Sequence, residues 1–206
     1  MFLIEFFQNG GYFMYAILIV LALGLAIALE RFLVLAGTSS KTNQVWKQLT
    51  PMLKANDFKR AEGFVQKQKS PLARILEHGL VKLHHNPKRE AVESAMEEGI
   101  MEVMPQLEQR THYLATLANI ATLLGLLGTI IGLIQAFTAV ASADPAEKAD
   151  LLSASISVAM NTTAFGLCAA IPMLLIHSLL ATKTAKLVEN IEMATLKCLN
   201  LMTDHD

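Results

Sequence analysis

Three long apolar stretches constrain what this chain can fold into more than any other feature of its sequence. Residues 12–35 contain only two charged side chains, 113–141 contain none, and 151–180 contain a single histidine and no charge. A helix of about 20 apolar residues crosses a bilayer. Only 17% of the chain is charged, compared with about 25% in soluble domains. The sequence therefore predicts an all-α integral membrane protein with three transmembrane helices.

The distribution of basic residues predicts the orientation of these spans. Of the 17 Lys and Arg residues, only Lys148 lies between the second and third spans, and none precedes the first. Lys and Arg concentrate on the cytoplasmic side of membrane proteins, so the N-terminus is expected outside the cytoplasm. The expected division is 1–11, an N-terminal interfacial helix; 12–35, the first span; 36–112, a cytoplasmic helical region; 113–141, the second span; 142–150, a short periplasmic loop; 151–180, the third span; and 181–206, a cytoplasmic C-terminal helix.

Capping signals predict several cytoplasmic helices after the first span. Asp57 can cap one helix, and Ser70-Pro71 and Asn86-Pro87 each place a capping residue before a proline in a first turn. The last of these helices is expected to continue into the second span without a break, bent at Pro105. The third span is likewise expected to extend into the cytoplasmic region.

The cytoplasmic parts of these helices show faces with a helical period. Glutamates on one face predict a solvated surface, with an ion-collecting rim as the alternative; they are Glu90, Glu93, Glu97, Glu98 and Glu102. Apolar residues predict packing seams; they are Val92, Met96, Val103, Leu107 and Leu114, and then Leu187, Ile191, Ala194, Cys198 and Leu201.

Small and polar residues form stripes inside the second and third spans. An ionisable residue inside a bilayer costs about 2.5–3.5 kcal/mol on insertion scales and usually marks an ion path, but these spans have none at mid-depth. Small-residue stripes permit close helix contacts, and their hydroxyls can serve ions or water. The stripes are Thr122, Gly125, Thr129 and Gly132, and then Ala159, Thr163, Gly166 and Ala170, beside Asn161 and Thr162.

Two long motifs in these spans resemble a known family. LATLANIATLLGLLGTIIGLIQAF (114–137) and TTAFGLCAAIP (162–172) resemble the second and third spans of the MotA/TolQ/ExbB proton-channel family, closest to its ExbB and TolQ branch. Glu30-Arg31 after the first span and SPLARILEHGL in the cytoplasmic region also resemble that branch. The resemblance therefore extends over nearly the whole chain.

This resemblance implies a function as well as a fold. It implies a homo-oligomeric ring of five copies in a bacterial inner membrane, around the single spans of an ExbD/TolR-like partner that carries a membrane aspartate. Thr129 and Thr163 are expected to face the pore near that aspartate, with Thr122, Thr162 and Asn161 along the same ion pathway. Proton flow would then move the partner and drive work on a TonB/TolA-like protein, for outer-membrane transport or integrity.

The remaining candidate residues are assigned to packing and to the membrane boundary. Glu30 and Arg31 point about 100° apart on a helix and are not expected to pair with each other. They are expected to anchor the span or bind other subunits, and His177 is expected at the interface. Candidates for helix packing are Gly125, Gly128, Gly132, Gly166 and Pro172, with Gly128 and Gly132 expected at a contact between subunits.

Several alternatives stay open. The hydroxyls of Thr129 and Thr163 can instead bond to a carbonyl of their own helix one turn back. ExbB-type sequences often carry a glutamate at the position of Val158, so its role cannot be transferred to this chain. The polar residues 161–163 leave sodium as an alternative to protons, and a non-conducting structural membrane scaffold is an alternative function.

Other function classes fit the sequence poorly. It has no cluster of His, Cys, Asp or Glu with metal or nucleophile spacing and no phosphate loop, so neither an enzyme nor a cofactor or metal site is expected. The net charge of -1 gives no indication of nucleic acid. Three spans without internal repeats do not suit a self-sufficient transporter. The expected partners are copies of the chain, the ExbD/TolR-like and TonB/TolA-like proteins, and membrane lipids.

Overall fold

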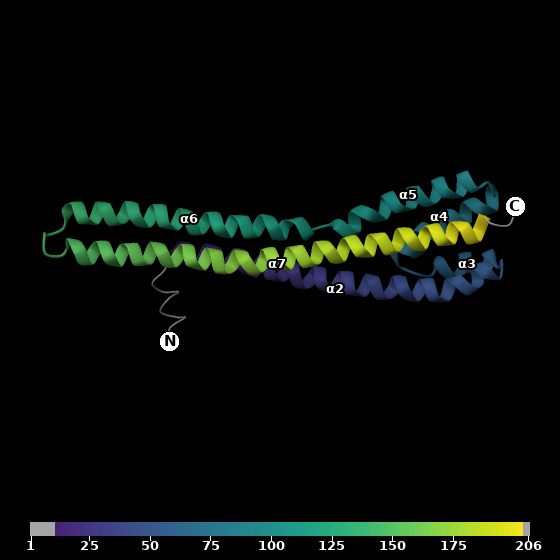
Figure 1. Cartoon of the computed structure of the whole chain (residues 1–206), viewed down its shortest axis with the longest axis horizontal. Coiled ribbons are helices and arrows are strands. Elements are labelled where there is room, and N and C mark those ends of the chain that lie inside the picture. The colour runs from purple at the N-terminus through teal and green to yellow at the C-terminus, as the bar shows by residue number, and fades with distance from the viewer. Residues whose placement is uncertain (1–10, 204–206) are drawn as a thin grey trace. The chain divides into compact units, whose positions relative to one another are not determined.

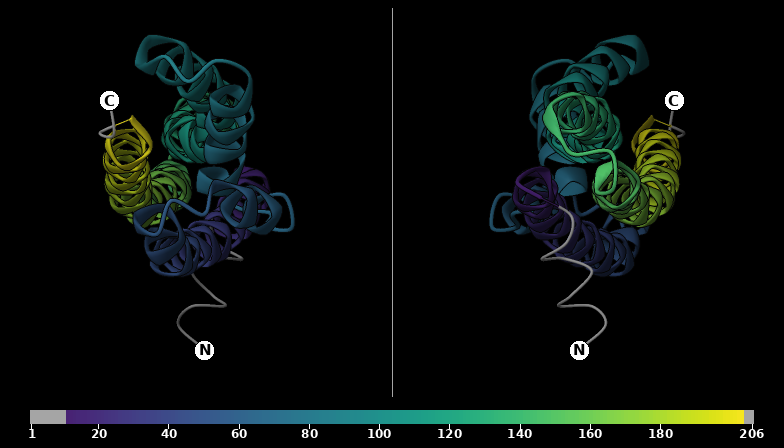
Figure 2. Two further views of the ribbon diagram at one scale, coloured as in Figure 1. Left: turned by 90° about the vertical axis from the view of Figure 1, so that its right-hand side faces the viewer. Right: turned by 90° about the vertical axis from the view of Figure 1, so that its left-hand side faces the viewer.

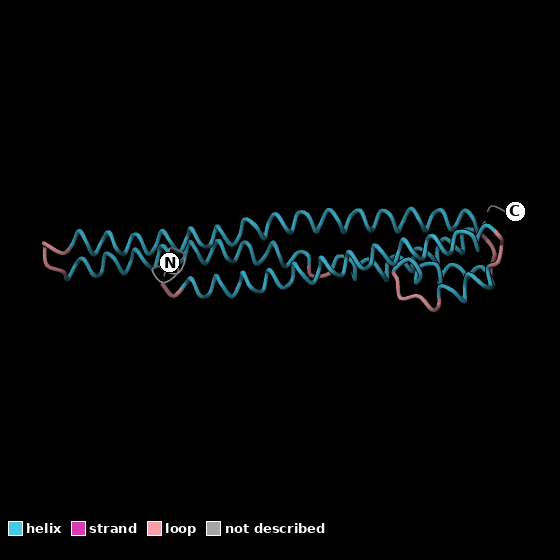
Figure 3. The backbone as a smooth tube through the Cα atoms, turned by 90° about the horizontal axis from the view of Figure 1, so that it is seen from below, coloured by secondary structure: helices cyan, strands magenta, loops and turns pink. Residues whose placement is uncertain are grey.

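The computed structural model describes residues 11–203, and every regular element in that range is an α-helix. The prediction of an all-α chain is confirmed for these residues, and only short loops join the helices (Figure 3). The interfacial helix expected at 1–11 lies outside the described residues except for Gly11. The helices are α2 (Phe13–Lys54), α3 (Phe58–Val65), α4 (Pro71–His85), α5 (Arg89–Glu108), α6 (Thr111–Ser142) and α7 (Lys148–Thr203) (Figure 1).

Three helical segments are long and apolar enough to cross a membrane, and they contain the three predicted spans: Phe13–Lys54, Arg89–Ser142 and Lys148–Thr203. The helix of the first span does not end at residue 35 as expected, because α2 continues to Lys54. Its extension buries Val45, Leu49 and Leu53, so packing along one face stabilises it beyond the apolar stretch. The loop before α7 is shorter than the predicted 142–150, since α6 ends at Ser142 and α7 begins at Lys148.

The expected continuous helix from Pro87 into the second span is wrong at two points. Asn86 is extended and its side chain accepts a hydrogen bond from the Lys88 amide at 3.3 Å, so the helix begins only at Arg89. The second break follows α5, where Arg110 has a φ of 63°. This left-handed conformation cannot continue a right-handed helix, so α5 ends at Glu108 and α6 starts at Thr111.

The two other predicted caps are confirmed. The Asp57 side chain accepts a hydrogen bond from the Arg60 amide at 3.2 Å at the start of α3. The Ser70 hydroxyl accepts one from the Ala73 amide at 3.2 Å, with Pro71 in the first turn of α4. Both caps satisfy amides that have no partner within the helix.

The described residues form two compact units. The span unit comprises residues 11–30 and Arg110–Leu179. Its three long helices, α2, α6 and α7, are seen end-on in Figure 2. The core that joins them is built mainly from small side chains. The core residues are Ile17, Ala118, Ala121, Ala169, Ala170 and Met173. Side chains of this size allow helix backbones to approach closely in an apolar environment.

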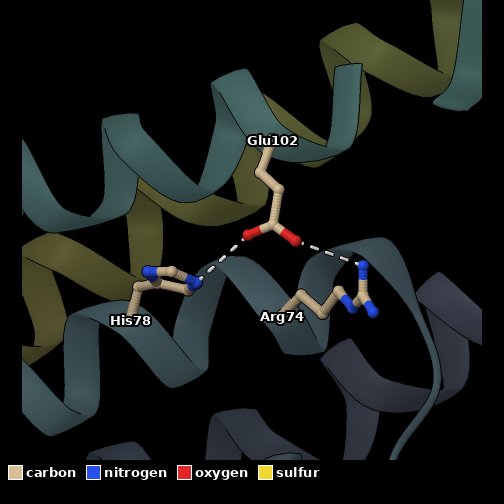
Figure 4. A network of polar contacts seen from close by, with 3 residues as sticks. All are labelled: Arg74, His78 and Glu102. Carbon is tan, nitrogen blue, oxygen red and sulfur yellow. Dashed lines mark hydrogen bonds and ion pairs between the residues drawn. The ribbon is translucent and has the colours of Figure 1, made fainter. Parts of the chain in front are cut away.

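The amphipathic unit comprises Arg31–Gln109 and residues 180–203. Its α4 and α5 pack closely, because a Cβ added at Gly99 would lie 3.0 Å from the Ile75 Cα atom. Glu102 joins the same helices on the surface, where its carboxylate lies 3.3 Å from the Arg74 guanidinium and 3.5 Å from the His78 ring (Figure 4). The Glu102 side chain is about half exposed, which fits a solvated acidic face.

Four residues of the predicted packing seam in the second half of α7 are buried: Leu187, Ile191, Ala194 and Cys198. Burial raises the pKa of the Cys198 thiol from 9.0 to about 12. The folded protein therefore keeps this thiol neutral at a pH where the unfolded chain has lost the proton. The contribution of the neutral Cys198 thiol to the free energy of unfolding is complete below pH 9 and is lost as the pH rises toward 12.

We expect the free energy of unfolding to fall above pH 9 in part because of Cys198, by at most about 1.4 kcal/mol per pH unit. Thermal unfolding of the detergent-solubilised protein between pH 7 and 10.5 measures this. Cys198→Ser keeps a small side chain without a titrating thiol and serves as the control. The stability difference between wild type and variant should be constant below pH 9 and shrink above it; a constant difference throughout contradicts the assignment.

Candidate functional site

The backbones of α6 and α7 approach each other closely in the span unit, at Gly125 and Gly166. A Cβ atom added at Gly166 would lie 2.8 Å from the Ala121 carbonyl oxygen and 3.1 Å from the Gly125 Cα atom. One added at Gly125 would lie 3.3 Å from the Gly166 Cα atom. All of these neighbours are backbone atoms, which cannot rotate away. A larger residue at Gly166 would therefore require a backbone shift, and one at Gly125 would require its neighbours to move by a few tenths of an ångström.

Thr163 donates a hydrogen bond across this contact. Its Oγ1 atom lies 2.9 Å from the Gly125 carbonyl oxygen on α6. In a regular α-helix, the same carbonyl also accepts the amide of residue i+4, here Thr129. The two threonines named by the family resemblance therefore meet at one carbonyl group. The alternative of a bond to its own helix does not describe the Thr163 hydroxyl.

The other threonine hydroxyls bond to their own helices. Thr129 donates to the Leu126 carbonyl at 2.6 Å, Thr122 to Ala118 at 3.2 Å and Thr162 to Val158 at 2.9 Å. Thr162 is only 2% exposed, whereas Thr129 is partly exposed. A donating hydroxyl still has lone pairs to offer to a cation or a proton donor. Thr122 is exposed as well, so both hydroxyls of the α6 stripe face outward and can accept.

Gly128 and Gly132 face α7 of the same chain, and this corrects the expectation of a contact between subunits. A Cβ added at Gly128 would lie 2.4 Å from the Thr162 Cγ2 atom, and one added at Gly132 would lie 3.0 Å from the Ala159 Cβ atom. The side of α6 that carries these glycines is thus occupied within the chain. Together with Gly125 and Gly166, these two glycines form the small-residue seam between α6 and α7.

Two further candidates in α7 lie apart from the centre of that contact. Asn161 is partly buried, one position before Thr162. Pro172 lies inside α7 and its side chain is exposed. Pro172 therefore does not share the burial of the seam glycines.

The boundary residues have partners that sequence spacing did not reveal. Glu30 pairs with Arg110, whose Nη1 atom lies 2.8 Å from the Glu30 Oε1 atom. Arg31 is buried and donates a hydrogen bond through Nη2 to the Leu107 carbonyl oxygen. Glu30 and Arg31 therefore both bond to distant residues of the same chain. His177 is partly buried in α7.

Two contributors to this region were missed in the sequence. Arg110 begins α6 with a positive φ, a conformation that usually takes Gly or Asn, so no local signal identified it. Gly24 faces Met173, and an added Cβ would lie 2.3 Å from the sulfur atom. A single glycine inside an apolar helix was the available signal for that contact.

In the apolar segments of the span unit, the polar groups are mainly hydroxyls, backbone carbonyls and side-chain amides such as that of Asn161. Sequence positions 13–29, 113–143 and 151–176 contain no Asp, Glu, Lys, Arg or His. Among the described residues, no group of three or more His, Cys, Asp or Glu could hold a metal ion. These oxygens can solvate an ion or accept a hydrogen bond, but they cannot carry a proton across a membrane by titration at ordinary pH.

Comparison with known proteins agrees with this chemistry. The profile of the MotA/TolQ/ExbB proton channel family matches residues 67–193, more than half of the chain. The chain is also similar to a putative biopolymer transport protein ExbB homolog from Methanothermobacter thermautotrophicus. The two are 28% identical over 192 residues, which is 92% of this chain and 67% of that protein.

We expect Gly166→Ala to weaken the packing of α6 against α7, because the new methyl group meets backbone atoms. Overpacking costs about 1–3 kcal/mol, more than the gain of about 1 kcal/mol from better helix propensity. Gly37→Ala is the matched control, since no atom lies within 4 Å of its added Cβ. Thermal unfolding in detergent should show a lower midpoint for the first variant and an equal or higher one for the second. Equal increases in both would contradict the close approach.

Proposed function

The chain belongs to the MotA/TolQ/ExbB proton channel family, and we propose that it is the ring-forming subunit of an ion-driven motor in a bacterial inner membrane. In this proposal about five copies surround an ExbD/TolR-like protein with a single span and a membrane aspartate, as the family resemblance implies. The complex converts the proton motive force into work on a TonB/TolA-like protein. Family membership itself places the chain among proton channel proteins rather than enzymes.

The observation that carries this proposal is the absence of any titratable carboxylate in the apolar segments of the sequence, next to a tightly packed α6–α7 contact. A charge that crosses the membrane releases about 2.3 kcal/mol per 100 mV. That energy can bias a mechanical step only when ions do not leak. A helix pair lined by apolar groups and hydroxyls holds back ions on its own. The group that binds and releases the proton must then come from the partner.

The exposed surface of the spans supports a ring. No more than 28% of the most apolar window of each candidate span is buried within the chain. Large apolar side chains remain exposed around α6, including Leu126, Ile130 and Phe137. One copy therefore leaves most of its apolar span surface to lipid and to other protein chains.

We assign the ion pathway to the polar residues of α6 and α7. Thr129 offers a partly exposed hydroxyl for a carboxylate or an ion, while Thr163 fixes the α7 side of the same site through Gly125. Thr122, Thr162 and Asn161 extend the pathway along the two helices. Glu30, Arg31 and His177 mark the cytoplasmic boundary, with the N-terminus on the periplasmic side as the basic residues indicate.

Two alternatives follow from specific features. The position of the frequent family glutamate is Val158, whose carbonyl accepts the Thr162 hydroxyl. Hydroxyl and carbonyl oxygens without a carboxylate suit sodium as well as a proton relay, so a sodium-driven member is the second candidate. A non-conducting structural scaffold is the third candidate, and it requires only that the span helices pack and assemble.

Substitution of Thr129 tests the ion pathway. We expect Thr129→Val to reduce ion-driven activity about tenfold or more, since an interaction of about 1.4 kcal/mol corresponds to a factor of ten. Thr138→Val is the matched control, because Thr138 lies on the same helix and its hydroxyl likewise bonds to a carbonyl of α6, that of Ile134 at 2.8 Å. The measurement is proton uptake by proteoliposomes that contain the ring and its partner, with assembly checked by size. Full activity of an assembled Thr129→Val ring would contradict the pore-lining role of Thr129, whereas no uptake by assembled wild type with its partner would support the scaffold.

The role of the partner is tested by omission. We expect purified rings without the single-span partner to pass no proton current in liposomes under an imposed potential. Current from such rings would refute the proposed division between the two proteins. Repeating the complete assay with and without sodium separates the coupled ions: unchanged activity in sodium-free medium supports protons, and loss of activity supports the sodium-driven alternative.

A further inference from the structure

A polar pocket of about 510 Å³ opens between α2 and α7 in the amphipathic unit. Leu35 and Leu187, which are both buried, contribute to its apolar lining. Its polar lining consists of two lysines, two serines and two asparagines: Lys183, Lys186, Ser39, Ser40, Asn43 and Asn190. Among the described residues that line the pocket, none is acidic.

This lining matches the chemistry of a phosphate group. Two ammonium groups supply positive charge and hydrogen-bond donors, and hydroxyl and amide groups add further donors around them. Without an acidic side chain in the lining, both lysine charges remain available to an anion. Basic pockets between membrane helices on the cytoplasmic side are typical binding sites for anionic lipid headgroups.

The position along the helices agrees with the headgroup layer. Lys183 and Lys186 lie three and six residues beyond residue 180, where the apolar stretch of α7 ends, or about 4.5 Å and 9 Å along the axis. The polar layer outside the hydrocarbon core is about 5–7 Å thick on each side. The two ammonium groups, on flexible side chains, are therefore within reach of lipid phosphates.

The adjacent surface of α2 suits an acyl chain. Phe32 is exposed and lies one turn before Ala36, on the face of α2 that lines the pocket. The Lys183 ammonium lies 4.2 Å from the centre of the Phe32 ring, at the junction of the apolar surface and the polar pocket. A cation–π contact of this kind holds the charge beside the ring. A free phosphate ion would use the lysines but not the apolar surface.

We propose that this pocket binds the phosphate group of an anionic phospholipid, with an acyl chain beside Phe32 of α2. The inference rests on the membrane orientation in the proposed function, because it requires the pocket to face the cytoplasmic leaflet. It names a specific site for the membrane lipids that surround the ring.

The test measures lipid retained by the full-length complex after purification in mild detergent. Wild type should retain added phosphatidylglycerol in preference to phosphatidylcholine, as measured by native mass spectrometry. The Lys183→Gln/Lys186→Gln variant should bind phosphatidylglycerol about tenfold or more weakly, while Lys183→Arg/Lys186→Arg should keep it. Equal retention by wild type and the Gln variant would overturn the proposal.

A matched control separates the pocket from general surface charge. Lys41→Gln/Lys197→Gln removes the same charge, and Lys41 lies six residues beyond residue 35, as far from its span as Lys186 is from residue 180. Neither control lysine lines the pocket. This variant should retain lipid like wild type. An equal loss in both double variants would show a diffuse electrostatic effect and would overturn the assignment to this pocket.

Two further arms identify the source of the phosphate and isolate the proposed function. Inorganic phosphate, added at millimolar concentration to delipidated complex, should not raise the unfolding midpoint, while phosphatidylglycerol should; equal stabilisation by both would mean that the pocket binds phosphate without the lipid. Proton uptake is measured separately on the same samples. If wild-type complex retains the lipid in the pocket but shows no proton uptake, the motor is contradicted and the lipid site is not. If wild-type complex shows normal uptake but no lipid binding specific to the pocket, only the lipid site is contradicted.

Discussion

The close approach of α6 and α7 at Gly125 and Gly166 is the contact on which the span unit depends. Inside a bilayer, lipid tails are as apolar as leucine side chains, so the hydrophobic effect does not drive helices together. Association relies on van der Waals packing, which is strongest where backbones meet. The three-helix core follows the same rule, since four of its six residues are alanines. Small residues that would weaken a core in water are the ones that hold these helices together in lipid.

The same constraint explains why the second and third spans carry no charge and yet suit an ion-driven machine. A carboxylate on α6 or α7 would cost insertion energy and would compete with the tight seam for space. Hydroxyl groups avoid both costs, because each can donate to a carbonyl of its own helix, as Thr122, Thr129 and Thr162 do. In the proposed function, the mobile charge lies on a separate polypeptide that moves relative to a ring of copies of this chain. This division is the physical core of the proposed function.

The sequence predicted features that depend on nearby residues and missed those that depend on distant ones. The caps at Asp57 and Ser70 were predictable because cap and helix are adjacent. The break before α6 was not, because Arg110 lacks the residue type typical of its conformation and pairs with Glu30, far away in the chain. The stripes of small residues were visible as spacing. Their contacts were not, since a stripe does not reveal whether it faces the same chain or another copy, and Gly128 and Gly132 face the same chain.

The hydrogen bond from Thr163 to Gly125 contributes less to stability than its position suggests. Bonds between helices in a membrane average about 0.6 kcal/mol, whereas relief of a backbone overlap such as that at Gly166 involves about 1–3 kcal/mol. The seam would therefore survive with a small apolar side chain at position 163. Such a side chain would not supply an oxygen atom beside the Gly125 carbonyl, which also accepts the Thr129 amide in a regular helix. The polar character of position 163 is better explained by a need for oxygen atoms at this depth than by the packing of the two helices.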